Sequence, residues 1–150
     1  MATQDNLKPD TARPEITMRR ATRDDIDLII AFVEPFVEAG TLLRRTVEEI
    51  DEWLPNFFIA EAEGKIVGCA ALEVYSKKLA EVRSLAVSPT VQGMGVGKML
   101  VSACVELARE KNILEVMAIS SNEQFFLSAG FDFTLPGQKK AFFIQTRDEY

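Results

Sequence analysis

The order of hydrophobic and polar residues along the first third of the chain predicts one strand followed by two helices. Residues alternate across Glu15–Thr22, which suits a strand, and apolar residues recur at helical spacing over Ile26–Val33. Proline lacks a backbone N–H, so we expect Pro35 to end or kink this first helix. A capping-box pattern, Thr46 with Glu49 three residues later, predicts the start of a second, short helix.

The rest of the chain predicts strands joined by two more helices. Strands bounded by turn residues are expected at Phe57–Glu61, Lys65–Tyr75, Leu79–Val87 and Ile113–Ile119. The clearest helical repeat begins at Val96 and ends near Lys111, and a short helix is expected at Asn122–Ala129. A last hairpin would join Phe131–Leu135 to Ala141–Thr146. Hairpins and crossovers in this order predict an α+β fold with one mixed sheet covered by helices.

Length and charge restrict the classes of function. A chain of 150 residues is the size of one domain, which we place at residues 15–150 after a polar, flexible tail at residues 1–14. The net charge is −6 and no long basic run occurs, so no nucleic-acid partner is expected. No apolar run reaches the roughly 20 residues of a membrane span, and the N-terminus has no signal-peptide pattern. The predicted location is therefore cytoplasmic, with no membrane partner.

The absence of histidine limits the chemistry most strongly. It excludes the Ser-His-Asp and Cys-His arrangements of nucleophilic catalysis, and it leaves acid–base chemistry to other side chains or to water. The two cysteines, Cys69 and Cys104, lie far apart in the sequence and match no zinc-binding spacing. We therefore expect two reduced thiols in the core and no metal site.

A glycine-rich turn connects the predicted strand Leu79–Val87 to the clearest helix. Gly93, Gly95 and Gly97 stand at alternate positions where that helix begins. Glycines let successive amides point inward, and the unpaired N–H groups of a helix start attract anions, so the turn predicts a phosphate-binding loop. The spacing fits neither the dinucleotide fingerprint G-x-G-x-x-G nor the nucleotide P-loop, whose outer glycines lie one residue further apart.

Two motifs resemble those of the GNAT acetyltransferase family. The Q-x-x-G-x-G pattern at Gln92–Gly97 lies on a strand-loop-helix unit, and Phe125–Phe131 is similar to the family's F-[FY]-x-x-x-G-F segment. The resemblance runs from about Ile16 to the C-terminus. It implies the GNAT fold, with a central mixed and mostly antiparallel sheet flanked by helices, and acetyl-CoA as cosubstrate. The cofactor-binding residues that it implies are Leu85, Ala86, Val87, Gln92, Gly93, Met94, Gly95, Val96, Gly97, Lys98 and Phe126.

Amide formation needs a neutral amine, and the resemblance implies that a glutamate on the strand before the glycine turn removes the proton. Glu81 is the first choice for this general base, and Glu73 on the preceding strand is the second. A plain ion pair between Glu81 and Arg83 is the structural alternative. Many relatives carry a tyrosine as general acid where this chain has Phe126, an aromatic residue that also suits a core. The thiolate then leaves unaided or is assisted by Ser120.

A loop with two arginines predicts the acceptor. Leu43, Arg44 and Arg45 lie beside the expected acceptor site, and guanidinium groups bind carboxylates through two hydrogen bonds. Together with Ala80–Val87, the loop resembles the acetyltransferase domain of N-acetylglutamate synthase. This implies that the acceptor is a small acidic amino acid, glutamate first, and that the enzyme acts in arginine biosynthesis. The residues implied to bind the acceptor are Leu43, Arg44 or Arg45, and Arg83.

Several alternatives stay open at this point. The two arginines could form a solvated charge cluster instead of a carboxylate site. The acceptor could be another small-molecule amine, such as a polyamine or an antibiotic, or a protein N-terminus. A protein that binds acyl-CoA without catalysis is the alternative from another class, and the last predicted strand could pair with a second copy in a homodimer.

Overall fold

The computed structural model describes residues 13–133, 137 and 140–148. The chain forms two compact units, residues 1–119 and 120–150. Most of the tail predicted at residues 1–14 lies outside the described residues. No helix in the described ranges is both long and apolar enough to cross a membrane.

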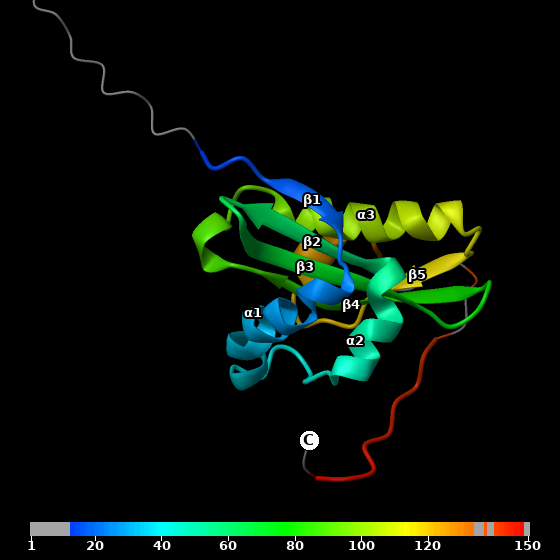
Figure 1. Ribbon diagram of the computed structural model, residues 1–150. Coiled ribbons are helices and arrows are strands. Elements are labelled where there is room, and N and C mark those ends of the chain that lie inside the picture. Colours follow the sequence, from blue (N-terminus) through cyan, green and yellow to red (C-terminus); the bar gives the residue numbers. More distant parts are fainter. Residues whose placement is uncertain (1–12, 134–136, 138–139, 149–150) are drawn as a thin grey trace, which may run out of the picture. The chain divides into compact units, whose positions relative to one another are not determined.

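A five-stranded sheet forms the centre of the first unit (Figure 1). Its strands are β1 Thr17–Arg20, β2 Phe57–Ala62, β3 Lys65–Val74, β4 Leu79–Val87 and β5 Glu115–Met117. They lie in the order β1-β2-β3-β4-β5, with β1 to β4 antiparallel to their neighbours and β5 parallel to β4. The prediction of a mixed, mostly antiparallel sheet is confirmed.

Helices cover both faces of this sheet (Figure 1). Two helices, α1 Ile26–Glu38 and α2 Val47–Trp53, lie on one face, while α3 Val96–Glu110 lies on the other. Short 3-10 turns occur at Arg23–Asp25, Leu54–Asn56 and Pro89–Val91. α3 is the crossover that connects β4 to its parallel neighbour β5, because parallel strands cannot be joined by a tight turn.

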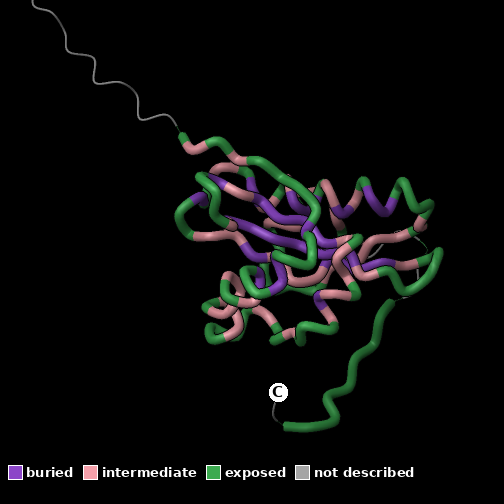
Figure 2. The backbone as a smooth tube through the Cα atoms, in the orientation of Figure 1, coloured by how far each residue is buried: buried purple, intermediate pink, exposed green. Residues whose placement is uncertain are grey.

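Alternation along β3 explains how both faces of the sheet are filled. Cys69 and Ala71 join the core that packs against α1, where Ile29 is 1% exposed. Gly68 faces α3, and a Cβ atom there would lie 2.9 Å from the Leu100 side chain. Glycine therefore lets α3 approach the sheet closely. Figure 2 shows the buried residues concentrated in the strands and on the helix faces that meet them.

Local sequence signals account for most element boundaries. The Thr46 hydroxyl accepts the amide of Glu49 at 3.1 Å, and the Glu49 carboxylate accepts the amide of Thr46 at 3.3 Å, which confirms the capping box. Glu63 and Gly64, both at positive φ, form the predicted turn between β2 and β3. Two strands are much shorter than predicted: β1 against Glu15–Thr22, and β5 against Ile113–Ile119.

Of the two outcomes predicted for Pro35, an end or a kink of the first helix, the end is wrong, because α1 continues to Glu38. The proline removes only its own N–H, and its carbonyl still accepts the amide of Ala39 at 3.0 Å. Phe32 and Phe36 pack with their ring centroids 5.7 Å apart. This packing spans the proline and holds the last turn of α1 in place.

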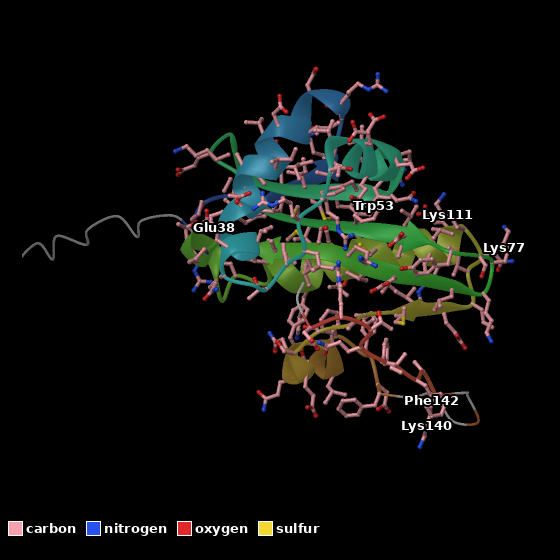
Figure 3. The ribbon with its side chains drawn as sticks, turned by 90° about the horizontal axis from the view of Figure 1, so that it is seen from below. Glu38, Trp53, Lys77, Lys111, Lys140 and Phe142 are labelled. Carbon is pink, nitrogen blue, oxygen red and sulfur yellow. The ribbon has the colours of Figure 1, made fainter. Side chains whose placement is uncertain are left out.

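The predicted last hairpin is also wrong for the described residues. Neither Phe131–Phe133 nor Ala141–Thr146 forms a strand, and Leu135 lies outside the described residues. Phe142, labelled in Figure 3, is 91% exposed. Alternating apolar residues give a strand only where a neighbouring strand completes the backbone hydrogen bonds. The described part of the second unit contains no such neighbour.

Candidate active site

Beyond Glu81, one edge of β4 has no strand partner among the described residues. β5 pairs with β4 only at Leu79, Ala80 and Glu81, so the edge from Val82 to Val87 is free. Within this stretch Ser84 has a φ of 54°, and the β3–β4 register shifts by one residue, which marks a β-bulge. The Cys69 thiol donates to the Ser84 carbonyl at 3.2 Å and supports the bulge.

The glycine turn that follows β4 presents backbone N–H groups at the start of α3. Gly93 and Gly95 have φ values of 79° and 78°, and no atom lies within 4 Å of the position that a Cβ would take at either residue. The amides of Gln92 and Met94 donate to carbonyls within the turn at 3.4 and 3.3 Å. The amides of Gly93, Gly95, Val96, Gly97 and Lys98 have no backbone acceptor in the described part of the chain. The turn is thus an open site for an anion.

The predicted base Glu81 lies in a hydrogen-bonded cluster on the face of the sheet that carries α1 and α2. Glu81 is 5% exposed, and its Oε1 accepts the Tyr75 hydroxyl at 2.6 Å and Nη1 of Arg83 at 3.0 Å. Glu73 is paired with Glu81 across β3 and β4, and its Oε2 lies 3.1 Å from the Tyr75 hydroxyl and 3.2 Å from Nη1 of Arg83. One guanidinium therefore faces both carboxylates.

Trp53 holds two of the predicted arginines beside this cluster. The ring, labelled in Figure 3 at the end of α2, lies 5.2 Å from the guanidinium carbon of Arg45 and 5.9 Å from that of Arg83. The Arg45 side chain is 17% exposed and donates from Nη1 to Glu49 at 3.3 Å. Its Nε is buried and has no hydrogen-bond partner among the described residues. Arg45 therefore retains an unused donor.

A pocket lies next to Arg45, between α1, the loop before α2, and the bulge in β4. Its polar lining comes from Glu34, Arg44, Arg45 and Ser84, and its remaining lining is mostly aliphatic. Arg44 donates from both Nη atoms to the Glu34 carboxylate at 2.7 Å, and its side chain is 64% exposed. Leu43 lines the same pocket and is 59% exposed. The two adjacent arginines thus differ: both Nη atoms of Arg44 bind Glu34, whereas Nε of Arg45 has no hydrogen-bond partner among the described residues.

Two predicted site residues, Ser120 and Phe126, belong to the second unit. The Ser120 hydroxyl accepts the amide of Asn122, at the start of α4 Glu123–Ser128, at 3.0 Å. Phe126 packs edge to face against Phe125 and Phe131, with centroid distances of 5.0 and 5.3 Å. Within this unit Phe126 is an aromatic packing residue.

The comparison with protein families matches the Acetyltransferase (GNAT) family over residues 27–131, more than half of the chain. The chain belongs to the GNAT family. It is an acetyl-CoA-dependent N-acetyltransferase.

Three similar proteins show which acetyltransferases this chain resembles. The chain is 35% identical to an uncharacterized N-acetyltransferase from Chlorobaculum tepidum, over 76% of this chain and 74% of that protein. It is 32% identical to an amino-acid acetyltransferase from Mycobacterium tuberculosis, over 83% and 71%. The N-acetylglutamate synthase from Neisseria gonorrhoeae, solved with coenzyme A and N-acetyl-glutamate, matches with a TM-score of 0.69 and 32% identity, over 77% of this chain but only 28% of that one.

Sequence reasoning missed two residues that contact the predicted site residues, Tyr75 and Trp53. Tyr75 lies two positions after Glu73, so the two share a strand face, and Glu73 is the residue paired with Glu81 across β3 and β4. That signal was available in the sequence. Trp53 reaches Arg45 and Arg83 from another element, and nothing in the local sequence around it indicates either contact.

Proposed function

We propose that this acetyltransferase moves the acetyl group of acetyl-CoA to the α-amino group of a small acidic amino acid, glutamate first, and so acts in arginine biosynthesis. The observation that carries the proposal is the mostly buried guanidinium of Arg45, which borders the pocket with an unpartnered Nε. The N-acetyl-glutamate in the Neisseria gonorrhoeae structure supports glutamate as the acceptor. The amino-acid acetyltransferase from Mycobacterium tuberculosis supports the same class of acceptor.

The proposed coenzyme site uses backbone groups. The unpaired amides of the glycine turn and the first turn of α3 would receive the diphosphate, because a helix N-terminus favours anions. The free edge at Leu85–Val87 would pair with the pantetheine arm as an additional strand. Acetyl-CoA supplies the activated thioester carbonyl, and the chain supplies position and hydrogen bonds.

Arg45 is the residue that we assign to the acceptor carboxylate. A buried guanidinium with a free donor gains more from a carboxylate than an exposed one, since water competes less for its hydrogen bonds. Arg44 is engaged with Glu34 at the same pocket and would gain less. Leu43 and Arg83 complete the proposed acceptor site, Leu43 through apolar contact at the pocket wall and Arg83 by sharing the Trp53 ring with Arg45.

We assign Glu81 as the base and propose direct attack of the amine on the thioester. Burial raises the pKa of Cys69 and Cys104 to about 12, so neither thiol supplies the thiolate that an acyl-enzyme would need at neutral pH. Only these two cysteines occur in the chain. Glu81 then serves by removing a proton from the amine, directly or through a water molecule.

Release of free thiol from acetyl-CoA tests this proposal, measured with glutamate, arginine, spermidine and a short peptide at equal concentrations. We expect kcat/KM for glutamate to be at least tenfold above that for each other amine. A preference for spermidine or arginine would show that a cationic acceptor is the substrate. Stabilisation by acetyl-CoA without thiol release from any amine would show that the protein binds the coenzyme without catalysis.

A further inference from the structure

A short hydrogen bond joins the buried residue Glu81 to the exposed residue Tyr75. Glu81 is 5% exposed, whereas Tyr75 is 50% exposed, and the hydroxyl of Tyr75 lies 2.6 Å from Oε1 of Glu81. A buried carboxyl group that takes a proton in each turnover must also lose it in each turnover. Because the Glu81 side chain is only 7% exposed, the groups that contact it are the candidates for carrying this proton to solvent.

The stoichiometry of the reaction makes this exchange necessary. At neutral pH an α-amino group is largely protonated, since its pKa is roughly 7.7–8.0. One N–H bond of the ammonium group breaks, and its proton goes to Glu81. The nitrogen lone pair then forms a bond to the thioester carbon, the C–S bond breaks, and a second amine proton ends on the coenzyme A sulfur. One proton per turnover therefore remains on the enzyme and has to reach solvent.

We propose that the Tyr75 hydroxyl is the proton outlet of Glu81, and that it passes the proton to Glu73 and from there to water. The inference rests on the proposed function, in which Glu81 is the base. Tyr75 is the one hydroxyl that the described structure places against Glu81, and it also lies 3.1 Å from Oε2 of Glu73. The outlet thus consists of three groups in line: a buried carboxyl, a half-exposed hydroxyl and a second carboxylate.

The hydroxyl has a single hydrogen, which allows it to serve the two carboxylates in turn. While Glu81 is charged, Tyr75 donates to it at 2.6 Å, the shorter of the two contacts. When Glu81 is protonated and its proton-bearing oxygen faces Tyr75, the Glu81 O–H bond breaks as a new bond to the Tyr75 oxygen forms. The original Tyr75 O–H bond breaks, and that hydrogen joins Glu73. The Tyr75 hydroxyl has to rotate towards Glu73 before this transfer. Afterwards it carries the former Glu81 hydrogen and again donates to Glu81, and loss of the Glu73 proton to water restores the first state.

The charged group that faces this cluster assists the transfer without competing for the proton. Arg83 donates from Nη1 to Tyr75 at 3.2 Å and lies 3.0 Å from Glu81 and 3.2 Å from Glu73, so its charge faces both carboxylates at once. An arginine does not lose its proton in a protein, so it cannot act as the outlet. Burial, followed by the hydrogen bond to Glu81, raises the pKa of Tyr75 to about 12, which keeps the hydroxyl protonated between turnovers.

The variant Tyr75→Phe tests the outlet, because it keeps the ring and removes the hydroxyl. With the acceptor that gives the highest rate, we expect kcat to fall about tenfold at low buffer concentration and the acceptor KM to stay within twofold. Adding imidazole at constant ionic strength should restore kcat of Tyr75→Phe, because a small buffer molecule takes the proton in place of the hydroxyl. The wild-type rate should not respond to imidazole.

Two further variants complete the test: one is a control for loss of a hydroxyl, and the other tests the proposed base itself. Ser76→Ala removes the neighbouring hydroxyl, which accepts the amide of Lys78 at 3.1 Å and does not touch Glu81, so its rate should equal the wild-type rate. Glu81→Gln should be slow when no imidazole is present. A Tyr75→Phe enzyme that keeps the wild-type rate, or that is slow and does not respond to imidazole, overturns the outlet alone. A Glu81→Gln enzyme with the wild-type rate overturns the proposed base, and the outlet with it.

Discussion

The proposed coenzyme edge and the proposed acceptor face of this acetyltransferase differ in the groups that form them. The coenzyme edge is backbone: the unpaired side of β4 and the amides at the start of α3, all within residues 82–98. The acceptor face is made of side chains, with Arg45 from the loop before α2, Trp53 from α2, Tyr75 from the segment after β3, and Glu81 and Arg83 from β4. The first depends on a local sequence, and the second depends on the tertiary fold.

This difference predicts how substitutions in each region act. Backbone amides remain when a side chain is replaced, so the coenzyme edge should respond only to changes that alter the φ angles of the glycines. Every hydrogen bond on the acceptor face ends on a side chain, so a single truncation there should change turnover or acceptor binding. Coenzyme affinity and acceptor affinity should therefore respond to separate sets of variants.

Glu81→Gln should have the largest effect. The variant keeps the shape of the side chain but cannot accept a proton, so we expect kcat to fall about 100-fold or more, the usual contribution of a general base. The coenzyme edge is unchanged, and the Kd of acetyl-CoA measured by calorimetry should stay within twofold. A matching loss of coenzyme affinity would show that the two regions are not separate.

Arg45→Ala should have the next largest effect, and Arg44→Ala is its matched control. Loss of a charge-assisted hydrogen bond costs about 2 kcal/mol, so we expect the KM for glutamate to rise about 30-fold in Arg45→Ala with acetyl-CoA binding unchanged. Arg44 is paired with Glu34 on the surface, and its removal should raise KM by less than threefold. Steady-state kinetics on both variants decides which arginine binds the acceptor, and the reverse order would contradict the assignment.

Gly95→Ala tests the coenzyme edge, with Gly64→Ala as its control. Both glycines have positive φ values, 78° and 74°, and neither has an atom within 4 Å of the Cβ position, so both variants carry a similar backbone strain. That strain should lower the free energy of unfolding in each by about 1 kcal/mol. Only Gly95→Ala should weaken acetyl-CoA binding, by about tenfold in a calorimetric titration. Equal coenzyme affinity in the two variants would remove the glycine turn from the site.

Asp25→Asn should change stability and leave both regions functional. Asp25 is 5% exposed and accepts two hydrogen bonds from Arg19 at 2.7 and 2.8 Å, which hold the pKa of this carboxyl well below its usual range. The folded state therefore favours the charged form, and the stability that this gives is present at pH 7. It is lost as the pH falls below about 4, the pKa of an unfolded aspartate.

The measurement for Asp25→Asn is urea denaturation across pH. At pH 7 we expect the variant to be about 2 kcal/mol less stable than the wild type, because a buried charge-assisted pair is lost. The difference should shrink as the pH falls below about 4, because the unfolded wild type then takes up a proton on Asp25 while the folded state, with its lowered pKa, still holds the charge. A constant difference over this range would mean that Asp25 does not gain its stability from ionisation. Thiol release at pH 7 should be unchanged.

The sequence predicts most of the fold and the strand-turn-helix unit that carries the glycine turn, because these signals are local. The glycine spacing, the capping box at Thr46 and the strand Leu79–Val87 each lie within a few residues, and the structure confirms the elements that they predict. The two errors have different causes. Pro35 lies inside α1, where Phe32 packs against Phe36 across it, and Ala141–Thr146 has strand alternation without a neighbouring strand in the described second unit.

The acceptor face is less predictable from the sequence. Arg44 and Arg45 are equivalent as neighbours in the sequence. In the structure both Nη atoms of Arg44 bind Glu34, whereas Arg45 binds Glu49 through Nη1 and keeps an unpartnered Nε. Tyr75 could be found from the hairpin register, whereas the contacts of Trp53 depend on how α2 packs against the sheet. Residue types indicate which chemistry is available, and tertiary contacts decide which residue performs it.

Amide and indole resonances of the labelled protein, followed by NMR while ligands are added one at a time, test the separation of the two regions most directly. The chain has a single tryptophan, so its indole N–H gives one signal that reports on the acceptor face. On addition of coenzyme A, we expect the largest shifts at the amides of Gly93, Gly95 and Gly97, with the Trp53 indole unmoved. Subsequent addition of glutamate should move the Trp53 indole. Coenzyme shifts centred away from the glycine turn would contradict the account.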